Sequence, residues 1–235
     1  EITTMFEREP ISAGELMDKQ FLPKPVIVEG MLPAGTYILA GTPKIGKSFL
    51  MTQLCWSVAE GIPFLGLATR KSTVLYLALE DTQERLQSRL VRMFGTDWSG
   101  SEFHLLFQIN QQGDALIQRF QDFILAHPDT RLIVIDTLQR VRESDGSSYS
   151  YSHDYETILP LKTFADAYDI ALIVVHHTRK NESDENLFNQ ISGTNGLLGA
   201  ADGAFLLHQG KNDVLLEQTG RDKNGRGELI LTEEH

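Results

Sequence analysis

Cysteine is almost absent from this sequence: Cys55 is the only one among 235 residues. A single cysteine excludes a disulfide within the chain and any metal site built from several thiolates. It also suits a reducing compartment, so we expect a cytoplasmic protein. Because Cys55 lies in a largely apolar stretch, we expect a small buried side chain there rather than a redox centre.

Long apolar runs are also missing. No stretch approaches the roughly 18 consecutive apolar residues that a membrane-spanning helix needs, so we expect no membrane partner. The beginning of the sequence also lacks the basic and apolar segments of a signal peptide. Its first residue is Glu1, which suggests a trimmed sequence.

Basic residues are in short supply: 21 lysines and arginines stand against 32 aspartates and glutamates, for a formal net charge of −11. Proteins that grip nucleic acid usually present a basic face, since contacts to phosphates supply most of their affinity. The net charge therefore argues against DNA binding by the isolated chain, without excluding a local basic channel. A content of 41% hydrophobic and 23% charged residues is ordinary for a globular protein, and the length suits one large α/β domain.

Residues 41–48 carry a specific chemical motif. They read GTPKIGKS and fit G-x-x-x-x-G-K-[ST], the phosphate-binding loop of nucleotide hydrolases. Gly41 and Gly46 let the backbone turn tightly enough to point several N–H groups at a phosphate. Lys47 places an ammonium on the β- and γ-phosphates, and the Ser48 hydroxyl ligates Mg²⁺. We expect the nucleotide to contact Gly41, Thr42, Pro43, Lys44, Ile45, Gly46, Lys47, Ser48 and Phe49.

The surroundings of the loop support this interpretation. An apolar strand is expected directly before it, at 37–40, and residues 49–56 follow it with helical spacing. The chain is therefore predicted to bind a nucleoside triphosphate together with Mg²⁺, and ATP is the default nucleotide. Lys44, inside the loop, either adds charge near the phosphates or points to solvent.

Strand and helix patterns alternate along most of the chain, which predicts an α/β fold with a mainly parallel, twisted sheet covered by helices on both faces. The last third changes to successive strands joined by Gly/Asn turns, so antiparallel strands are expected at the C-terminal edge. The expected strands are 26–29, 73–79, 103–107, 131–135, 170–175, 204–208, 214–217 and 228–232. The expected helices are 12–19, 82–93, 114–126 and 155–167, besides the one after the phosphate loop.

The domain organisation follows from the same patterns. Residues 1–25 are predicted to form an N-terminal arm, and 26–235 a single ATPase domain. Two polar stretches, 143–154 and 180–195, are expected to be long surface loops, which in compact domains are usually functional or disordered. The outer face of helix 82–93 is expected to present Glu84, Arg85, Arg89 and Arg92.

Two carboxylate positions follow apolar strands. Asp136 comes after the run LIVI and is expected to hold the Mg²⁺ shell opposite Ser48, although many core strands end in this way. In many phosphate-loop enzymes the catalytic acid directly follows the metal aspartate, but residue 137 is threonine. Glu80 is therefore the candidate that orients and deprotonates the attacking water, with Asp81 capping the next helix. Alternatively, Glu80 and Asp81 are both helix caps.

Taken together, these motifs resemble the RecA-like P-loop ATPases, and among them the plasmid RepA and DnaB-type hexameric replicative helicases. The matching positions are the loop 41–48, Glu80, Asp136 and the segments 174–180 and 191–202. The resemblance extends over roughly 26–232 and its motifs are specific in combination rather than singly. It implies a RecA-like core, ATP hydrolysis with Mg²⁺, and assembly of identical subunits into a ring or filament.

The resemblance also implies roles for two histidines and two basic residues. His176 or His177 is expected to contact the γ-phosphate as a sensor, and strand alternation aims only one of them inward. Because adjacent strand residues point to opposite faces, the same alternation argues against a metal ion shared by the two histidines. Arg221 or Lys223 is expected to reach the ATP of a neighbouring subunit. The alternative for that segment is a plain polar hairpin turn, which its Asn-Gly pair favours.

The resemblance also makes single-stranded DNA a candidate partner, because it implies that the two long loops correspond to the DNA-facing loops of RecA-like rings. Their acidic residues oppose such contacts, whereas basic residues at their roots and Tyr149, Tyr151 and Phe188 support them. The leading hypothesis is a RepA-like helicase motor acting in DNA replication or recombination. The alternatives are an ATP-dependent switch or assembly module without helicase activity, and a small-molecule kinase, for which no arginine-rich lid is evident.

Overall fold

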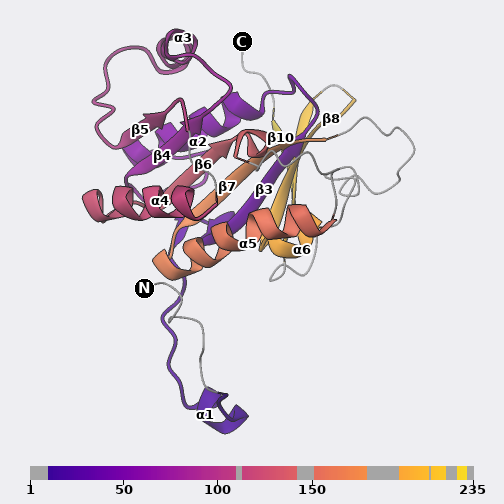
Figure 1. Cartoon of the computed structure of the whole chain (residues 1–235). Coiled ribbons are helices and arrows are strands. Elements are labelled where there is room, and N and C mark those ends of the chain that lie inside the picture. The colour runs from indigo at the N-terminus through magenta and orange to yellow at the C-terminus, as the bar shows by residue number, and fades with distance from the viewer. Residues whose placement is uncertain are drawn as a thin grey trace.

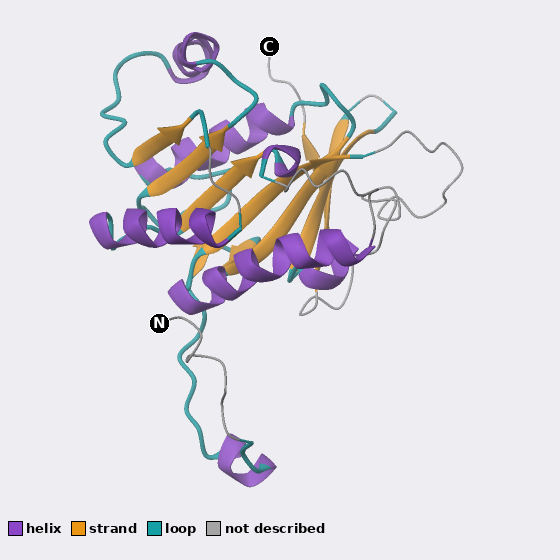
Figure 2. Cartoon of the chain, viewed as in Figure 1, coloured by secondary structure: helices purple, strands orange, loops and turns teal. Residues whose placement is uncertain are grey.

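A computed structural model describes residues 10–109, 113–141, 151–178, 196–211, 213–220 and 227–231. Its centre is one eight-stranded sheet with the order β10-β9-β8-β3-β7-β6-β4-β5. The strands from β8 to β5 are mutually parallel, and β9 and β10 continue the sheet in antiparallel fashion. Figure 2 shows this twisted sheet between two layers of helices. The predicted fold class is confirmed, including the antiparallel strands at one edge.

The elements are short and closely follow the sequence patterns. The strands are β1 Val26–Val28, β2 Leu32–Pro33, β3 Gly35–Gly41, β4 Val74–Ala78, β5 Phe103–Leu106, β6 Leu132–Asp136, β7 Ala171–His177, β8 Gly203–Gln209, β9 Val214–Gly220 and β10 Gly227–Leu231. The helices are α1 Ala13–Met17, α2 Lys47–Glu60, α3 Gln83–Phe94, α4 Asp114–Ala126, α5 Tyr151–Tyr168 and α6 Gly196–Ala200, with a 3₁₀ turn, η2, at Leu138–Arg140. No helix in these parts of the chain is long and apolar enough to cross a membrane.

The central strands are buried because helices cover both faces of the sheet. Every residue of β3, β4 and β6 is buried, which explains why these strands read as continuous apolar runs. One face packs against α2 and the first turns of α3, and the other against α4, α5 and α6 (Figure 1). Side chains alternate between these two cores along each strand, so odd and even positions of β7 face different helices.

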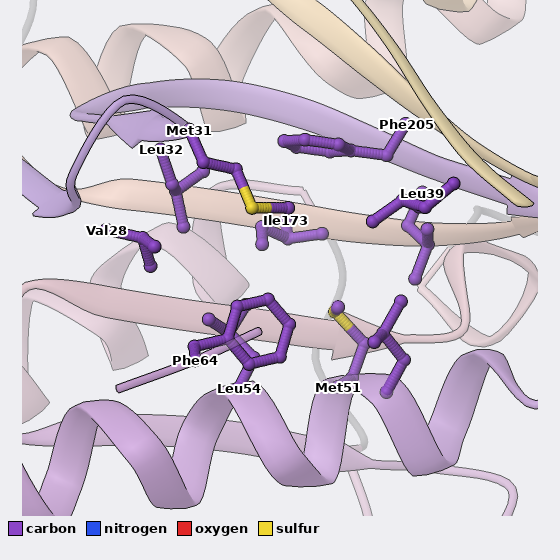
Figure 3. A pocket seen from close by; sticks show the side chains of 11 residues that line it. Val28, Met31, Leu32, Leu39, Met51, Leu54, Phe64, Ile173 and Phe205 are labelled. Atoms are coloured by element: carbon purple, nitrogen blue, oxygen red, sulfur yellow. The ribbon is translucent and has the colours of Figure 1, made fainter. Parts of the chain in front are cut away.

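Apolar packing fixes α2, and with it the phosphate loop, against the sheet. A small cavity of about 10 Å³ lies where α2, the β1–β2 hairpin and the sheet meet, and Figure 3 shows the side chains that line it. The labelled side chains around it are Val28, Met31, Leu32, Leu39, Met51, Leu54, Phe64, Ile173 and Phe205. Because the space is close to the size of one water and has no polar lining, it belongs to the core and is not a ligand site.

The structure differs from the predicted elements at several boundaries. Helix α5 begins at Tyr151, four residues earlier than expected, so the loop predicted at 143–154 ends before that residue. Residues 142–150 and the whole predicted loop 180–195 lie outside the described residues. Strand β7 continues through His177 because its end pairs with Ala40 and Gly41 of β3. The short β2, which pairs with β1, was not predicted. Helix α1 has no buried residue and lies away from the domain (Figure 1).

Candidate nucleotide-binding site

The phosphate loop connects β3 to α2, and its two glycines are needed for different reasons. Gly46 has φ 104°, a left-handed conformation that a side chain would strain. Gly41 lies within β3, where an added Cβ would stand 2.5 Å from the carbonyl oxygen of Leu207 in β8. Lys44, at the tip of the loop, also has a positive φ of 67°. The loop is therefore held in one tight shape at the start of a helix, which is where anions bind.

Lys47 lies in the first turn of α2 and is only 4% exposed. Its ammonium donates to the carbonyl oxygens of Gly41, at 2.7 Å, and of Thr42, at 2.9 Å. Burial lowers the Lys47 pKa to about 8, against the opposing charges of Asp136 and Glu80. Within the described part of the chain, the Lys47 ammonium forms no ion pair with a carboxylate, and it lies at the point where the phosphates are expected.

Asp136 ends β6 beside the phosphate loop and is 5% exposed. The Tyr76 hydroxyl donates to its Oδ2 at 2.7 Å. Burial raises the pKa of Asp136, and hydrogen bonds from Ser48 and Tyr76 oppose this rise. The Ser48 hydroxyl and the Asp136 carboxylate thus lie together, and oxygen donors of this kind suit Mg²⁺.

The residues present fit a magnesium ion that is held mainly through nucleotide and water. Among the residues that the structure describes, no group of three or more His, Cys, Asp or Glu side chains could hold a metal alone. Mg²⁺ usually keeps several waters and takes only one or two protein oxygens together with substrate phosphates. Ser48 and Asp136 provide such a pair.

Glu80 follows β4 at the same edge of the sheet. Ala78 of β4 pairs with Asp136 of β6, so the two carboxylates lie at the ends of neighbouring strands, as predicted. The Thr137 hydroxyl donates to Glu80 Oε1 at 3.0 Å, and His177 Nε2 lies 3.7 Å from Glu80 Oε2. Position 137 thus supplies no acid itself, and its threonine instead orients the Glu80 carboxylate, which follows the neighbouring strand.

The histidine pair is divided between the two faces of the sheet. His177 pairs with Gly41 in register and lies on the α2 face, where it lines the same cavity as Glu80. His176, one residue earlier, belongs to the opposite face. Of the two candidate sensors, the structure places His177 at the site.

Two predictions about α3 are wrong. Thr82, not Asp81, caps the helix, because its side chain accepts a hydrogen bond from the Arg85 backbone N–H. Asp81 forms ion pairs instead, at 3.4 Å with Arg85 and at 2.7 Å with Arg89. Arg89, placed by the sequence on the outer face, has a side chain only 11% exposed and lies 4.7 Å over the Phe49 ring.

Arg89 therefore lines the cavity, which its sequence pattern did not predict. Its position three residues after the buried Leu86, on the same helical face, was the available signal. Its charge, which favours an exposed position on average, led to the opposite placement.

These side chains surround one cavity of about 490 Å³, a size that suits a small-molecule ligand. It lies at the carboxyl ends of β3, β4, β6 and β7, where ligands of parallel sheets bind. It is lined by Pro43, Lys44, Gly46, Lys47, Ser48, Phe49, Tyr76, Ala78, Glu80, Asp81, Arg85, Arg89, Asp136 and His177.

Not every predicted residue lines this cavity. Gly41 and Thr42 lie behind it and hold Lys47 through their carbonyls, while Ile45 packs against the core. Arg221 and Lys223 lie outside the described residues.

The fold and this arrangement of residues define a P-loop ATPase of the RecA-like class. The chain matches the profile of the AAA domain family AAA_25 over residues 3–183, which is most of its length. The chain therefore belongs to that family.

Relatives of known name support the same class. The chain is 28% identical over 158 residues to the DNA repair protein RadA of Streptococcus pneumoniae, covering 66% of this chain and 33% of that protein. It is 26% identical over 160 residues to RadA of Helicobacter pylori, covering 67% of this chain and 32% of that protein. The chain thus spans about a third of the length of the curated relatives it matches.

Solved structures share the fold. One solved ATPase domain superposes with a TM-score of 0.66 at 15% identity, covering 84% of this chain and 80% of that chain. A DnaB-like replicative helicase superposes with a TM-score of 0.65 at 12% identity, covering 84% of this chain and 54% of that one. The predicted RecA-like core, of the kind found in DnaB-like helicases, is confirmed.

Proposed function

We propose that this chain binds ATP with Mg²⁺, hydrolyses it, and works as a RepA-like helicase motor in DNA replication or recombination. The observation that carries the proposal is the convergence of Lys47, Ser48, Asp136 and Glu80 on one cavity at the carboxyl ends of parallel strands. Such residues supply the cation, the metal ligands and the base that in-line attack of water on a γ-phosphate requires.

Each side chain has a separate part in the proposed reaction. Lys47 neutralises charge on the β- and γ-phosphates, and Glu80 orients the attacking water and accepts its proton. Thr137 fixes the rotation of Glu80 through the 3.0 Å hydrogen bond. His177, next to Glu80, responds to loss of the γ-phosphate. Mg²⁺, held by Ser48 and Asp136, supplies charge neutralisation on the phosphate oxygens.

Assembly is part of the proposal. We infer a homo-oligomeric ring or filament in which Arg221 or Lys223 reaches the ATP of a neighbouring subunit, and single-stranded DNA as the polymer on which it acts. The RadA relatives are described as DNA repair proteins and a structural neighbour as a replicative helicase, which supports a DNA-linked role. Residues 26–235 would form the ATPase domain, residues 1–25 an arm, and the cytoplasm the place of action.

Hydrolysis rates measured with and without single-stranded DNA test the function. At low salt, we expect Mg²⁺-dependent ATP hydrolysis that single-stranded DNA accelerates several-fold, and we expect the active species to be larger than a monomer by light scattering. Full activity in a strict monomer would contradict the role given to Arg221 or Lys223.

A second function is favoured by the net charge of −11. An acidic surface opposes contacts with the phosphate backbone and suits an ATP-dependent switch or assembly module that acts on partner proteins. Under this alternative, ATP hydrolysis persists but is unaffected by DNA at low salt. The same assay therefore separates the two functions.

A further inference from the structure

The Asp136 carboxylate, which would face Mg²⁺, is held by a hydroxyl for which the proposed reaction gives no role. Tyr76, in the middle of β4, is 1% exposed and donates to Asp136 Oδ2 at 2.7 Å. We propose that Tyr76 is a positioning residue that fixes the Asp136 carboxylate, and thereby sets how strongly Mg²⁺ supports nucleotide binding. This inference rests on the proposed function.

The strand register explains why a tyrosine suits this task. Tyr76 of β4 pairs with Val134 of β6, and Ala78 pairs with Asp136. Tyr76 and Asp136 therefore lie on the same face, two residues apart along the strands, a displacement of roughly 7 Å. A serine or threonine hydroxyl at position 76 would be too close to its own backbone to span that displacement, whereas a phenol places its hydroxyl far from the Cα.

The hydrogen bond limits which carboxylate orientations are open. Oδ2 accepts the Tyr76 hydroxyl, and the Ser48 side chain lies near enough to the same carboxylate to oppose the rise in its pKa that burial causes. The group is thus held between the phenol and the residue that is expected to share the metal with it. Outer partners of this kind orient metal ligands, and their loss typically weakens metal binding roughly 10- to 100-fold.

The tyrosine ring is fixed independently of its hydroxyl. It belongs to the core on the α2 face and lies 6.4 Å from the Phe103 ring, centroid to centroid. Tyr76→Phe therefore keeps the packing and removes only the donor. Tyr37→Phe is a matched control, since Tyr37 is also a buried tyrosine of this core and does not line the nucleotide cavity.

The test is binding of a fluorescent, non-hydrolysable ATP analogue to the whole chain, titrated with Mg²⁺ and repeated in EDTA. For Tyr76→Phe we expect unchanged affinity in EDTA and a Mg²⁺ midpoint raised roughly 10- to 100-fold. Tyr37→Phe should leave both values at those of the wild type. In an Asp136→Ala background, Tyr76→Phe should have no further effect on the midpoint, because the two changes remove one interaction.

Two outcomes would overturn the proposal. An unchanged Mg²⁺ midpoint in Tyr76→Phe would show that the hydroxyl does not position the carboxylate. An equal loss of affinity with Mg²⁺ and in EDTA would assign Tyr76 a purely structural role. If the wild type itself shows no Mg²⁺-dependent binding, the proposed function fails as well, and the two failures are thereby distinguished.

Discussion

The two ends of the central strands carry similar polar residues in different surroundings. At the carboxyl ends, Lys47, Glu80 and Asp136 line one open cavity. At the opposite end, Lys162 of α5 forms an ion pair with Asp202, which also accepts the Thr36 backbone N–H at 2.9 Å. Charges that engage one another stabilise the fold, whereas charges that line a cavity are available to a ligand.

The two lysines express this difference most directly. Lys162 contacts two carboxylates, those of Asp202 and, at 3.2 Å, Asp166. Lys47 is bonded to backbone carbonyls, and burial lowers its pKa to about 8. The fold therefore tolerates an unfavourable buried charge at the site, and an incoming triphosphate would relieve it.

The largest effect is expected from removing charge at the cavity end. Glu80→Gln keeps the hydrogen bond to Thr137 possible and abolishes the base, so hydrolysis should fall by roughly 10²- to 10⁴-fold with ATP binding retained. Glu102→Gln, at the other end of the sheet near Thr73, should leave the rate within about twofold, since it lines no part of the cavity. Steady-state phosphate release measures both. Equal losses would erase the distinction between the two ends.

The pH dependence of ATP binding should reveal the lowered pKa of Lys47 at the cavity end of the sheet. Because the Lys47 pKa is about 8, its ammonium loses its proton above that pH and must regain it when phosphates bind. The Kd for ATP should therefore rise by about tenfold between pH 7 and pH 9, at constant salt. In Lys47→Arg the cation stays charged over this range, so whatever its affinity, the profile should be flat. A flat wild-type profile would contradict the assigned pKa.

Replacing either lysine by methionine should change stability in opposite directions. Because the pKa of Lys47 is lowered from 10.5 to about 8, keeping this group charged in the folded state costs free energy. The cost is complete below pH 8 and shrinks as the pH rises from 8 towards 10.5. Lys47→Met should thus stabilise the chain by about 1 kcal/mol at pH 7. Lys162→Met removes the cation that pairs with the partly buried Asp202 carboxylate and should destabilise the chain by about 2 kcal/mol. Urea unfolding at pH 7 measures both changes in unfolding free energy. Changes of the same sign in the two variants would contradict the difference drawn between the two lysines.

Local sequence predicted the parts of the site that depend on consecutive residues. The loop from Gly41 to Ser48 and the strand that ends at Asp136 were placed correctly because each is defined by its own pattern. Glu80 was identified by elimination, from the threonine at 137, and the structure adds the contact between these two residues.

The missed features depend on pairing between distant segments. The contact between Tyr76 and Asp136 requires the register of β4 against β6, which neither strand encodes alone. Arg89 was placed outside because its charge suggested solvent, whereas Asp81 and the Phe49 ring hold it inside. The choice between His176 and His177 likewise needed the pairing of β7 with β3.

At the end of the sheet opposite the cavity, Lys24, Lys162, Asp166 and Asp202 form a cluster of ion pairs. The smallest effect on stability is expected from its most exposed pair. Lys24, just before β1, pairs with Asp166 at 2.9 Å, but the two side chains are 53% and 39% exposed. Exposed pairs contribute about 0–1 kcal/mol, so Lys24→Met should cost less than about 1 kcal/mol, and the cost should shrink further in high salt. Lys162→Met should keep most of its cost in high salt, because its side chain is only 19% exposed. Urea unfolding at low and high salt measures both costs. The comparison shows whether the burial of an ion pair, rather than the number of charges, determines how much these residues stabilise the fold.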